Sequence, residues 1–227
     1  MSERLVSTTA QPTPENRWQR RRDRTRRALT LAALELFRTK GYNATTVEEI
    51  ANAADVSPRT FFHYFGSKEE VLFGGHDERR RNLISVLRDR LGAEPVWKAV
   101  CTAMMTVVDH FEADPDFFRE RARLYASEPG LRAAVLCIND KLVQEMTDVL
   151  AERLRCRPRD LTPRLIATFA NATMRSAIDC WVASGEDADL RAIATTSLSI
   201  ARPALRAASK GPLAVKGRSQ ARIRKLA

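Results

Sequence analysis

The stretch GYNATTVEEIANAADVSPRTFFHYFGSKEEV, residues 41–71, decides the fold class of this chain. Thr46 and Glu49 have the spacing of a capping box, in which each side chain accepts a hydrogen bond from a backbone N–H left free at the start of a helix. An apolar stripe with helical spacing follows: Val47, Ile50, Ala51 and Ala54. Ser57-Pro58 then provides an N-cap and a proline at the first position of a second helix. Two short helices joined by a tight turn predict a helix-turn-helix, in which Ser57 to Tyr64 is the recognition helix and DNA is the partner.

The residues on either side extend this unit. A helix predicted from about Arg20 to Thr39 has one apolar face, and Gly41 follows it at the position of a C-cap glycine. Ser67 and Glu70 form a second capping-box pattern, which opens a helix predicted to run to about Leu91. Gly74-Gly75 interrupts that helix, either as a weak point beside the DNA-binding unit or as a simple kink.

Prolines divide the rest of the chain into helices. The predicted helices are Pro95–Phe111, Pro115–Ser127, Pro129 to about Arg155, about Thr162 to Ser184, and Ala188–Ala207. The short turn Gly185-Glu186-Asp187 predicts that the last two helices pack as an antiparallel hairpin. The fold class is therefore all-α, with about nine helices in two domains. The first domain spans residues 17–73 and the second spans 74–207, while residues 1–16 and the basic tail 208–227 are predicted to be disordered.

The net charge of +10 is concentrated near the two ends of the chain. Residues 17–27 contain seven arginines and one aspartate, and residues 206–227 contain seven basic residues and no acidic one. Such segments are expected to neutralise DNA phosphates, although basic runs also serve as solubilising tails.

Several classes of protein are not indicated. There is no apolar segment typical of a signal peptide or a transmembrane helix, so a cytoplasmic protein is expected. The cysteines form no metal-binding pair and are expected to be reduced and mostly buried: Cys101, Cys137, Cys156 and Cys180. The three histidines have no metal-binding spacing, and there is no phosphate-binding loop or nucleophile motif. We therefore expect neither a metal, nor a cofactor, nor enzymatic activity.

The segment from about Arg21 to Val71 resembles the DNA-binding domain of the TetR family of bacterial transcription regulators. The matching pieces are Ala-Leu-Glu-Leu-Phe37, Lys40-Gly41-Tyr42, Thr45-Thr46-Val47, Ile50-Ala51, Val56-Ser57, Thr60-Phe61-Phe62, Tyr64-Phe65 and Ser67-Lys68-Glu69-Glu70. The resemblance implies a homodimer that binds a palindromic operator and usually represses transcription. It also implies that the domain at 74–207 binds a small effector and mediates dimerisation.

The resemblance and the side-chain chemistry together suggest the DNA-contacting residues: Arg21, Arg22, Thr46, Pro58, Arg59, Thr60, Phe62, His63, Tyr64 and Lys68. Arg59 is the first choice for reading a base, because a guanidinium can bond O6 and N7 of guanine together. Lys68 is assigned to a phosphate, and Thr46 to a phosphate through its backbone N–H. Phe62 lies where many family members have tyrosine, so it offers contact with a thymine methyl group or only packing. Phe61 and Phe65 are assigned to the domain core.

The second domain provides weaker signals. The dimer interface implied by the resemblance would use Ile166, Phe169, Thr173, Ala177, Trp181 and Leu198. The alternative is that this apolar stripe belongs to the core of the monomer. Methionines and aromatic residues at helical spacing are candidates for a ligand pocket, although such stripes also form plain core: Met104, Val108, Phe111, Phe118, Leu124, Met146, Met174 and Ile178.

Residues 118–124 and 128–132 resemble the C-terminal domain of mycofactocin-type regulators, a TetR branch associated with acyl-CoA-like ligands. This resemblance implies a lipophilic or acyl-CoA-like effector, with Arg119 or Arg123 near its phosphates. The same arginines can instead form surface pairs with Glu120 and Glu128. The sequence thus predicts a ligand-responsive repressor, and the alternative is an activator or architectural DNA-binding protein without an effector.

Overall fold

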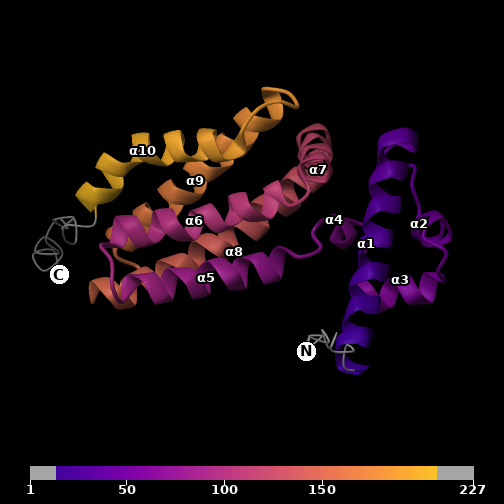
Figure 1. Cartoon of the computed structure of the whole chain (residues 1–227), viewed down its shortest axis with the longest axis horizontal. Helices are drawn as coiled ribbons and strands as arrows, with labels where there is room; N and C mark the ends of the chain where they lie inside the picture. Colours follow the sequence, from indigo (N-terminus) through magenta and orange to yellow (C-terminus); the bar gives the residue numbers. More distant parts are fainter. Residues whose placement is uncertain (1–13, 209–227) are drawn as a thin grey trace, which may run out of the picture. The chain divides into compact units, whose positions relative to one another are not determined.

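The computed structural model describes residues 14–208, with side chains described for Trp18 and from Arg21 onward. Within these residues the chain forms ten helices and no strand, and it divides into two compact units between Gly74 and Gly75 (Figure 1). The predicted all-α fold class is confirmed. Most of the predicted arms, 1–13 and 209–227, lie outside the described residues, whereas residues 14–16 and Ala208 belong to helices.

The N-terminal unit contains four helices: α1 (Pro14–Lys40), α2 (Val47–Ala53), α3 (Pro58–Tyr64) and α4 (Lys68–Leu72). Helices α2 and α4 pack on α1, and α3 packs on α2 (Figure 1). The core is formed by buried apolar side chains from all four helices and their connections: Leu29, Ala33, Phe37, Tyr42, Ile50, Phe61, Phe65 and Leu72. The burial of Phe61 and Phe65 confirms their assignment to this core.

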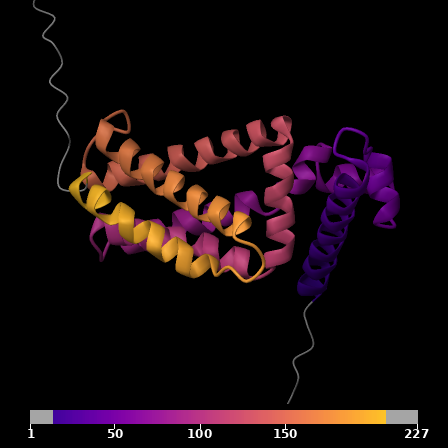
Figure 2. The ribbon, with the colours of Figure 1, turned by 90° about the horizontal axis from the view of Figure 1, so that it is seen from above.

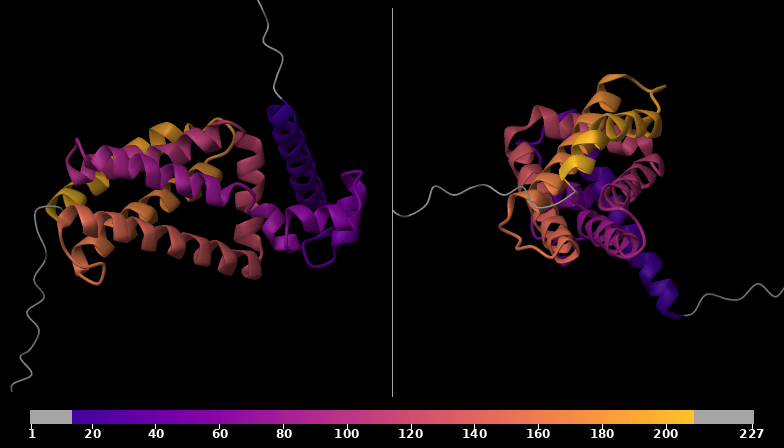
Figure 3. Two further views of the ribbon diagram at one scale, coloured as in Figure 1. Left: turned by 90° about the horizontal axis from the view of Figure 1, so that it is seen from below. Right: turned by 90° about the vertical axis from the view of Figure 1, so that its left-hand side faces the viewer.

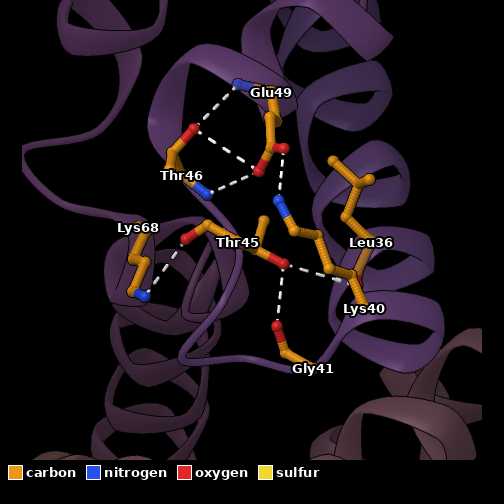
Figure 4. A network of polar contacts seen from close by, with 7 residues as sticks. All are labelled: Leu36, Lys40, Gly41, Thr45, Thr46, Glu49 and Lys68. Carbon is orange, nitrogen blue, oxygen red and sulfur yellow. Dashed lines mark hydrogen bonds and ion pairs between the residues drawn. The ribbon is translucent and has the colours of Figure 1, made fainter.

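Local hydrogen bonds fix the start of α2 (Figure 4). Glu49 N donates to Thr46 Oγ1 at 3.2 Å, and Thr46 N donates to Glu49 Oε2 at 3.0 Å, so the predicted capping box is confirmed. Thr45 Oγ1 donates to the carbonyl oxygen of Gly41 at 2.8 Å, which holds the turn between α1 and α2. Gly41 has φ 94° and its N–H donates to the carbonyl of Phe37, as a C-cap glycine does.

The predicted helix from Ser67 to Leu91 is two helices, α4 and α5 (His76–Leu91). Gly75 has φ 80°, a left-handed conformation that only glycine adopts readily, so the chain ends one helix and starts another there. The second capping box is also incomplete. Ser67 Oγ accepts from Glu70 N, but the Glu70 carboxylate accepts from the N–H of Gly66 instead of that of Ser67.

The C-terminal unit contains α5 and five further helices: α6 (Val96–Glu112), α7 (Pro115–Ser127), α8 (Pro129–Leu154), α9 (Leu161–Ala183) and α10 (Leu190–Ala208). Helices α9 and α10 run side by side as an antiparallel hairpin, which is the predicted arrangement (Figures 1 and 2). Helix α7 stands across one end of this bundle (Figure 2), and the long helices are seen end-on in the right panel of Figure 3. One continuous apolar core runs between the helices of this unit.

The structure tests the predictions about the cysteines and about membrane-spanning helices. Cys137 and Cys180 are exposed and Cys101 and Cys156 are half-buried, so the prediction of mostly buried thiols is wrong. None of the described helices is long and apolar enough to cross a membrane.

Candidate nucleic-acid interface and ligand cavity

The recognition helix α3 has one buried and one exposed side. Phe61 is fully buried, and the Phe65 that ends the helix is also buried. Arg59, Phe62 and His63, at helical spacing i, i+3 and i+4, are exposed on the other side. Phe62 is 55% exposed, which is unusual for a large apolar side chain and leaves its ring open to a partner. Pro58, Thr60 and Tyr64 are half-buried.

The start of α3 is held by its own sequence. Ser57 Oγ accepts a hydrogen bond from Thr60 N at 3.1 Å and lies 2.9 Å from Thr60 Oγ1. Asp55 has φ 53°, and this left-handed residue turns the chain from α2 into α3. Because Thr60 is engaged with the cap, its hydroxyl fixes the helix start in this structure.

Lys68 has a structural role that the sequence did not reveal, whereas Thr46 has the capping role that the sequence predicted. Lys68 Nζ donates to the carbonyl oxygen of Thr45 at 3.2 Å (Figure 4). It also donates to the carbonyl oxygen of Tyr42 at 2.9 Å and lies 4.4 Å from the centre of the Tyr42 ring. The lysine therefore joins α4 to the turn before α2. The Thr46 N–H, which we assigned to a phosphate, donates to Glu49 within the capping box.

The N-terminal half of α1 carries the basic segment. Arg21 and Arg22 are exposed, and the guanidinium of Arg22 lies 5.6 Å from the ring centre of Trp18, itself an exposed side chain. Helix α1 begins at Pro14, before the predicted start at Arg20. Arginines on an exposed helix can reach phosphates without rearrangement of the core.

The C-terminal unit contains a partly open cavity of about 650 Å³. Its wall is mainly apolar, and five of the eight predicted pocket residues contribute to it: Met104, Phe111, Phe118, Met174 and Ile178. Val108 and Met146 are fully buried core residues that do not line the cavity, and Leu124 is half-buried elsewhere, so these three assignments are corrected. Met104 and Val108 are one helical turn apart on the same apolar stripe of α6, so their spacing did not distinguish a residue that lines the cavity from one in the core.

The charged residues of this wall were missed from the sequence. Five arginines and one aspartate line the cavity: Arg79, Arg80, Arg121, Arg132, Arg175 and Asp179. Arg121 is only 2% exposed, and its guanidinium lies 4.4 Å from the centre of the Phe118 ring. The sequence did contain a signal that Arg121 lines the cavity. Arg121 follows Phe118 by three residues and precedes Tyr125 by four, so the three side chains share one face of α7.

Burial shifts the pKa of several groups at this end of the cavity. Burial, aided by the charge of Arg121, lowers the pKa of Arg79 to about 9, and burial also lowers the pKa of Arg121. Burial and the neighbouring arginines lower the pKa of His76 well below its ordinary value and that of His110 to about 4. Arg79 Nη1 lies 2.9 Å from His110 Nε2. Both histidines are therefore neutral near pH 7, while the arginines remain the cationic groups.

Arg119 and Arg123 do not line the cavity. Arg119 is buried, donates to the backbone carbonyls of Glu186 and Ala188, and stacks on Trp181 at 4.3 Å. It joins α7 to the turn before α10. Arg123 pairs with Glu120 on the surface, as in the alternative interpretation of the sequence.

The predicted dimer residues separate into two groups. Ile166, Ala177, Trp181 and Leu198 are buried within the unit's own core, so their side chains are not available to a partner. Phe169 is exposed and Thr173 is half-buried. Leu161, Leu165 and Phe169 form an exposed apolar stripe along α9, at spacing i, i+4 and i+8. Among residues 14–208 there is no group of three or more histidines, cysteines or acids that could hold a metal ion.

In the N-terminal unit, α2 and the capped helix α3 are joined by a tight turn, and the outer side of α3 is exposed. This arrangement defines a helix-turn-helix DNA-binding protein. Residues 29–73 match the family described as bacterial regulatory proteins, tetR family, and residues 94–206 match the MftR C-terminal domain. This chain belongs to the TetR family of bacterial transcriptional regulators.

Relatives of known sequence or structure are similar over most of their length. The chain is 32% identical over 209 residues to the HTH-type transcriptional regulator TcmR of Streptomyces glaucescens, covering 88% of this chain and 92% of that protein. It is 26% identical over 171 residues to MftR of Mycobacterium tuberculosis, a candidate regulator of mycofactocin biosynthesis, covering 74% and 85%. The fold is similar to that of FadR from Bacillus subtilis in complex with stearoyl-CoA, with a TM-score of 0.56 and 19% identity over 77% of this chain and 96% of that one.

Proposed function

We propose that this regulator is a homodimeric repressor that binds a palindromic operator and is released by a small lipophilic effector. The observation that carries this proposal is the cavity of about 650 Å³ in the C-terminal unit. Its volume is in the range of about 300–1,000 Å³ that binds drug-sized ligands, and its wall is mostly apolar. An acyl-CoA is one effector of this type, since the FadR of similar fold was solved with stearoyl-CoA.

Arg59, Phe62 and His63 are the proposed contacts with the bases. They are exposed together on one side of α3, whose other side is fixed in the core by Phe61. The Arg59 guanidinium suits a guanine, and the Phe62 ring suits a thymine methyl group. Pro58, Thr60 and Tyr64 would lie at the edge of this surface, while Arg21 and Arg22 on α1 would contact phosphates.

A dimer would place two such helices on successive turns of the operator, about 34–36 Å apart or a multiple of that. The exposed stripe of Leu161, Leu165 and Phe169 on α9 is the proposed contact with the second copy. Ile200 on α10 is 75% exposed and would extend it. Sedimentation equilibrium tests this, because Phe169→Glu should give monomers, whereas Thr195→Glu, at an exposed position of α10, should not.

The function is tested by fluorescence anisotropy of the full chain on DNA from upstream of its own gene, at one fixed salt concentration. Binding that is specific for this DNA and released by a long-chain acyl-CoA would support both the operator and the effector class. A cavity-filling variant, Met174→Trp, should bind the DNA and resist release. Specific binding that no lipophilic compound reverses would favour the second candidate, a DNA-binding regulator without an effector, against which the cavity argues.

A further inference from the structure

The first half of α1 extends beyond the packed core of the N-terminal unit. The buried side chains of this helix begin at Leu29, whereas Arg21, Arg22, Asp23 and Arg24 are all exposed. Consecutive residues of an α-helix point in directions about 100° apart, so four exposed in a row mean that no described part of the chain packs on this turn. The same part of α1 reaches past α2, α3 and α4 (Figures 2 and 3). Its surface is therefore open to a partner on every side.

One row of side chains leads from α3 into this open segment. Trp18, Arg22 and Arg26 follow one another along α1 at spacing i, i+4 and i+8. The Arg26 guanidinium lies 5.2 Å from the ring centre of Phe65, the residue that caps the end of α3, and the Arg22 guanidinium lies 5.6 Å from the ring centre of Trp18. Trp18 lies two helical turns, about 12 Å, beyond Arg26 along the helix axis. It is 60% exposed, so the row ends in an open indole ring flanked by a guanidinium.

The charge of this segment favours an anionic partner. Residues 17–27 contain seven arginines and one aspartate. Arg22 and Arg26 are four residues apart, a spacing at which like charges destabilise a helix, and a polyanion beside the helix relieves that repulsion. DNA is the polyanion that α3 is built to meet, and the row begins at the end of α3. One duplex is therefore within reach of both α3 and the first half of α1.

We propose that Trp18 is a DNA contact, an inference that rests on the DNA binding proposed for α3 above. Its indole lies against the sugar–phosphate backbone beside the base pairs that α3 reads, and its N–H donates to a phosphate oxygen. An indole nitrogen is a donor only and a phosphate oxygen is an acceptor, so the two are complementary. Arg22, which lies beside the ring, contacts the neighbouring phosphate. The segment from Trp18 to Arg24 thus anchors the protein on any duplex and does not read bases.

The tryptophan fluorescence of the full chain tests the contact directly. Trp18 is exposed, whereas Trp97 is half-buried and Trp181 is buried, so acrylamide quenches mainly Trp18 in the free protein. Acrylamide is neutral and is not repelled by DNA. An excess of duplex should protect most of the quenchable fluorescence, both with DNA from upstream of the gene and with a random sequence at low salt. Trp18→Phe should have little quenchable fluorescence with or without DNA, which assigns the signal.

Affinity measured against salt concentration separates the indole from the charge. Trp18→Ala should weaken binding about tenfold, by a similar factor on both duplexes and with an unchanged salt slope, because no charge is removed. Arg22→Gln should reduce the slope by about 0.9 for each protomer bound. The matched controls are Leu31→Ala and Arg38→Gln, which remove an exposed apolar side chain and an exposed arginine from α1 outside the row. Neither control should change the affinity or the slope.

The outcomes separate this inference from the proposed function. Protection of Trp18 together with weaker binding of Trp18→Ala on both duplexes supports the anchor, even if the upstream DNA is bound no better than the random sequence, which would reject the operator instead. A Trp18 that stays open to acrylamide on bound DNA, or a Trp18→Ala variant that binds as tightly as the wild type, would overturn the anchor and leave the operator in place. A loss confined to the upstream duplex would also overturn it, since a backbone contact does not depend on sequence. If the wild type binds neither duplex, both proposals are rejected.

Discussion

Lys68 offers the sharpest test of the structure against the sequence, because the two assign it different roles. The sequence suggested a contact with a DNA phosphate. In the structure Nζ donates to the carbonyl oxygens of Tyr42 and Thr45, on the turn that leads into α2, and Figure 4 shows the bond to Thr45. Lys68→Met keeps most of the apolar stem and removes the charge, so it should loosen this unit without removing a phosphate contact.

The size of the effect follows from the contacts that are lost. A hydrogen bond to a charged group contributes about 1.5–3 kcal/mol, and a cation–π contact near the surface about 0.5–1 kcal/mol. Lys68 is half-buried and its two hydrogen bonds share one ammonium group, so these contributions do not add fully. We expect Lys68→Met to lower the free energy of unfolding of the N-terminal unit by about 2–3 kcal/mol, which corresponds to roughly 30- to 150-fold more frequent opening.

Hydrogen exchange measured by mass spectrometry on the full chain reads this opening directly, in peptides that cover residues 41–73. Operator affinity measured against salt concentration provides the second readout. If Lys68 has the role described, exchange accelerates and the dependence of log affinity on log salt keeps its slope. The matched control is Lys40→Met, which removes an exposed lysine paired with Glu49 and should change stability by no more than about 1 kcal/mol. Unchanged exchange together with a slope reduced by about 0.9 would refute the reasoning, since that is the signature of one lost phosphate contact.

Three further predictions concern both units. Thr46→Ala should destabilise the N-terminal unit by about 1 kcal/mol, because it removes one half of the capping box, and urea unfolding that leaves the midpoint unchanged would contradict this. Arg59→Ala should cost about 1–3 kcal/mol of binding and relax specificity at one operator position, and an equal loss on all DNA sequences would exclude base reading. The folded-state pKa values of His76 and His110 lie below the unfolded value of about 6.5, so the unfolded chain binds more protons as the pH falls below that value. The C-terminal unit should therefore lose stability between about pH 6.5 and pH 4, and urea midpoints at pH 7 and pH 5 should differ less in His110→Gln than in the wild type.

Much of the fold was predictable because its determinants are local. The caps at Thr46 and Ser57 bond to N–H groups three residues away, so their spacing in the sequence is sufficient to identify them. Proline at the start of α7 and α8 marked those helices at the residues where they begin, Pro115 and Pro129. The helix boundaries that differed from the prediction, such as the break at Gly75, depend on backbone conformations that two adjacent glycines permit but do not require.

The functional surfaces were less predictable, since each is built from several helices. Val108 and Met104 both belong to the apolar stripe of α6, and only the packing of α7 and α9 decides that Met104 lines the cavity while Val108 is plain core. On α9, Trp181 is buried against Phe111 of α6 and Arg119 of α7, whereas Phe169 is exposed.

The sequence by itself determined the helix-turn-helix, its caps, the sides of α3 and the all-α class, because hydrogen bonds within one helical turn and apolar periodicity are written in consecutive residues. Only the tertiary structure decided that Lys68 supports a turn, that Arg119 joins two helices, and that Arg121 lines a cavity with Arg79. Each of these side chains reaches a partner on another element, from 23 to 69 residues away for the hydrogen bonds of Lys68 and Arg119. A long, flexible cation has the same appearance in the sequence whether it faces water, a carbonyl oxygen or a ligand, and the packing of the surrounding helices makes that choice.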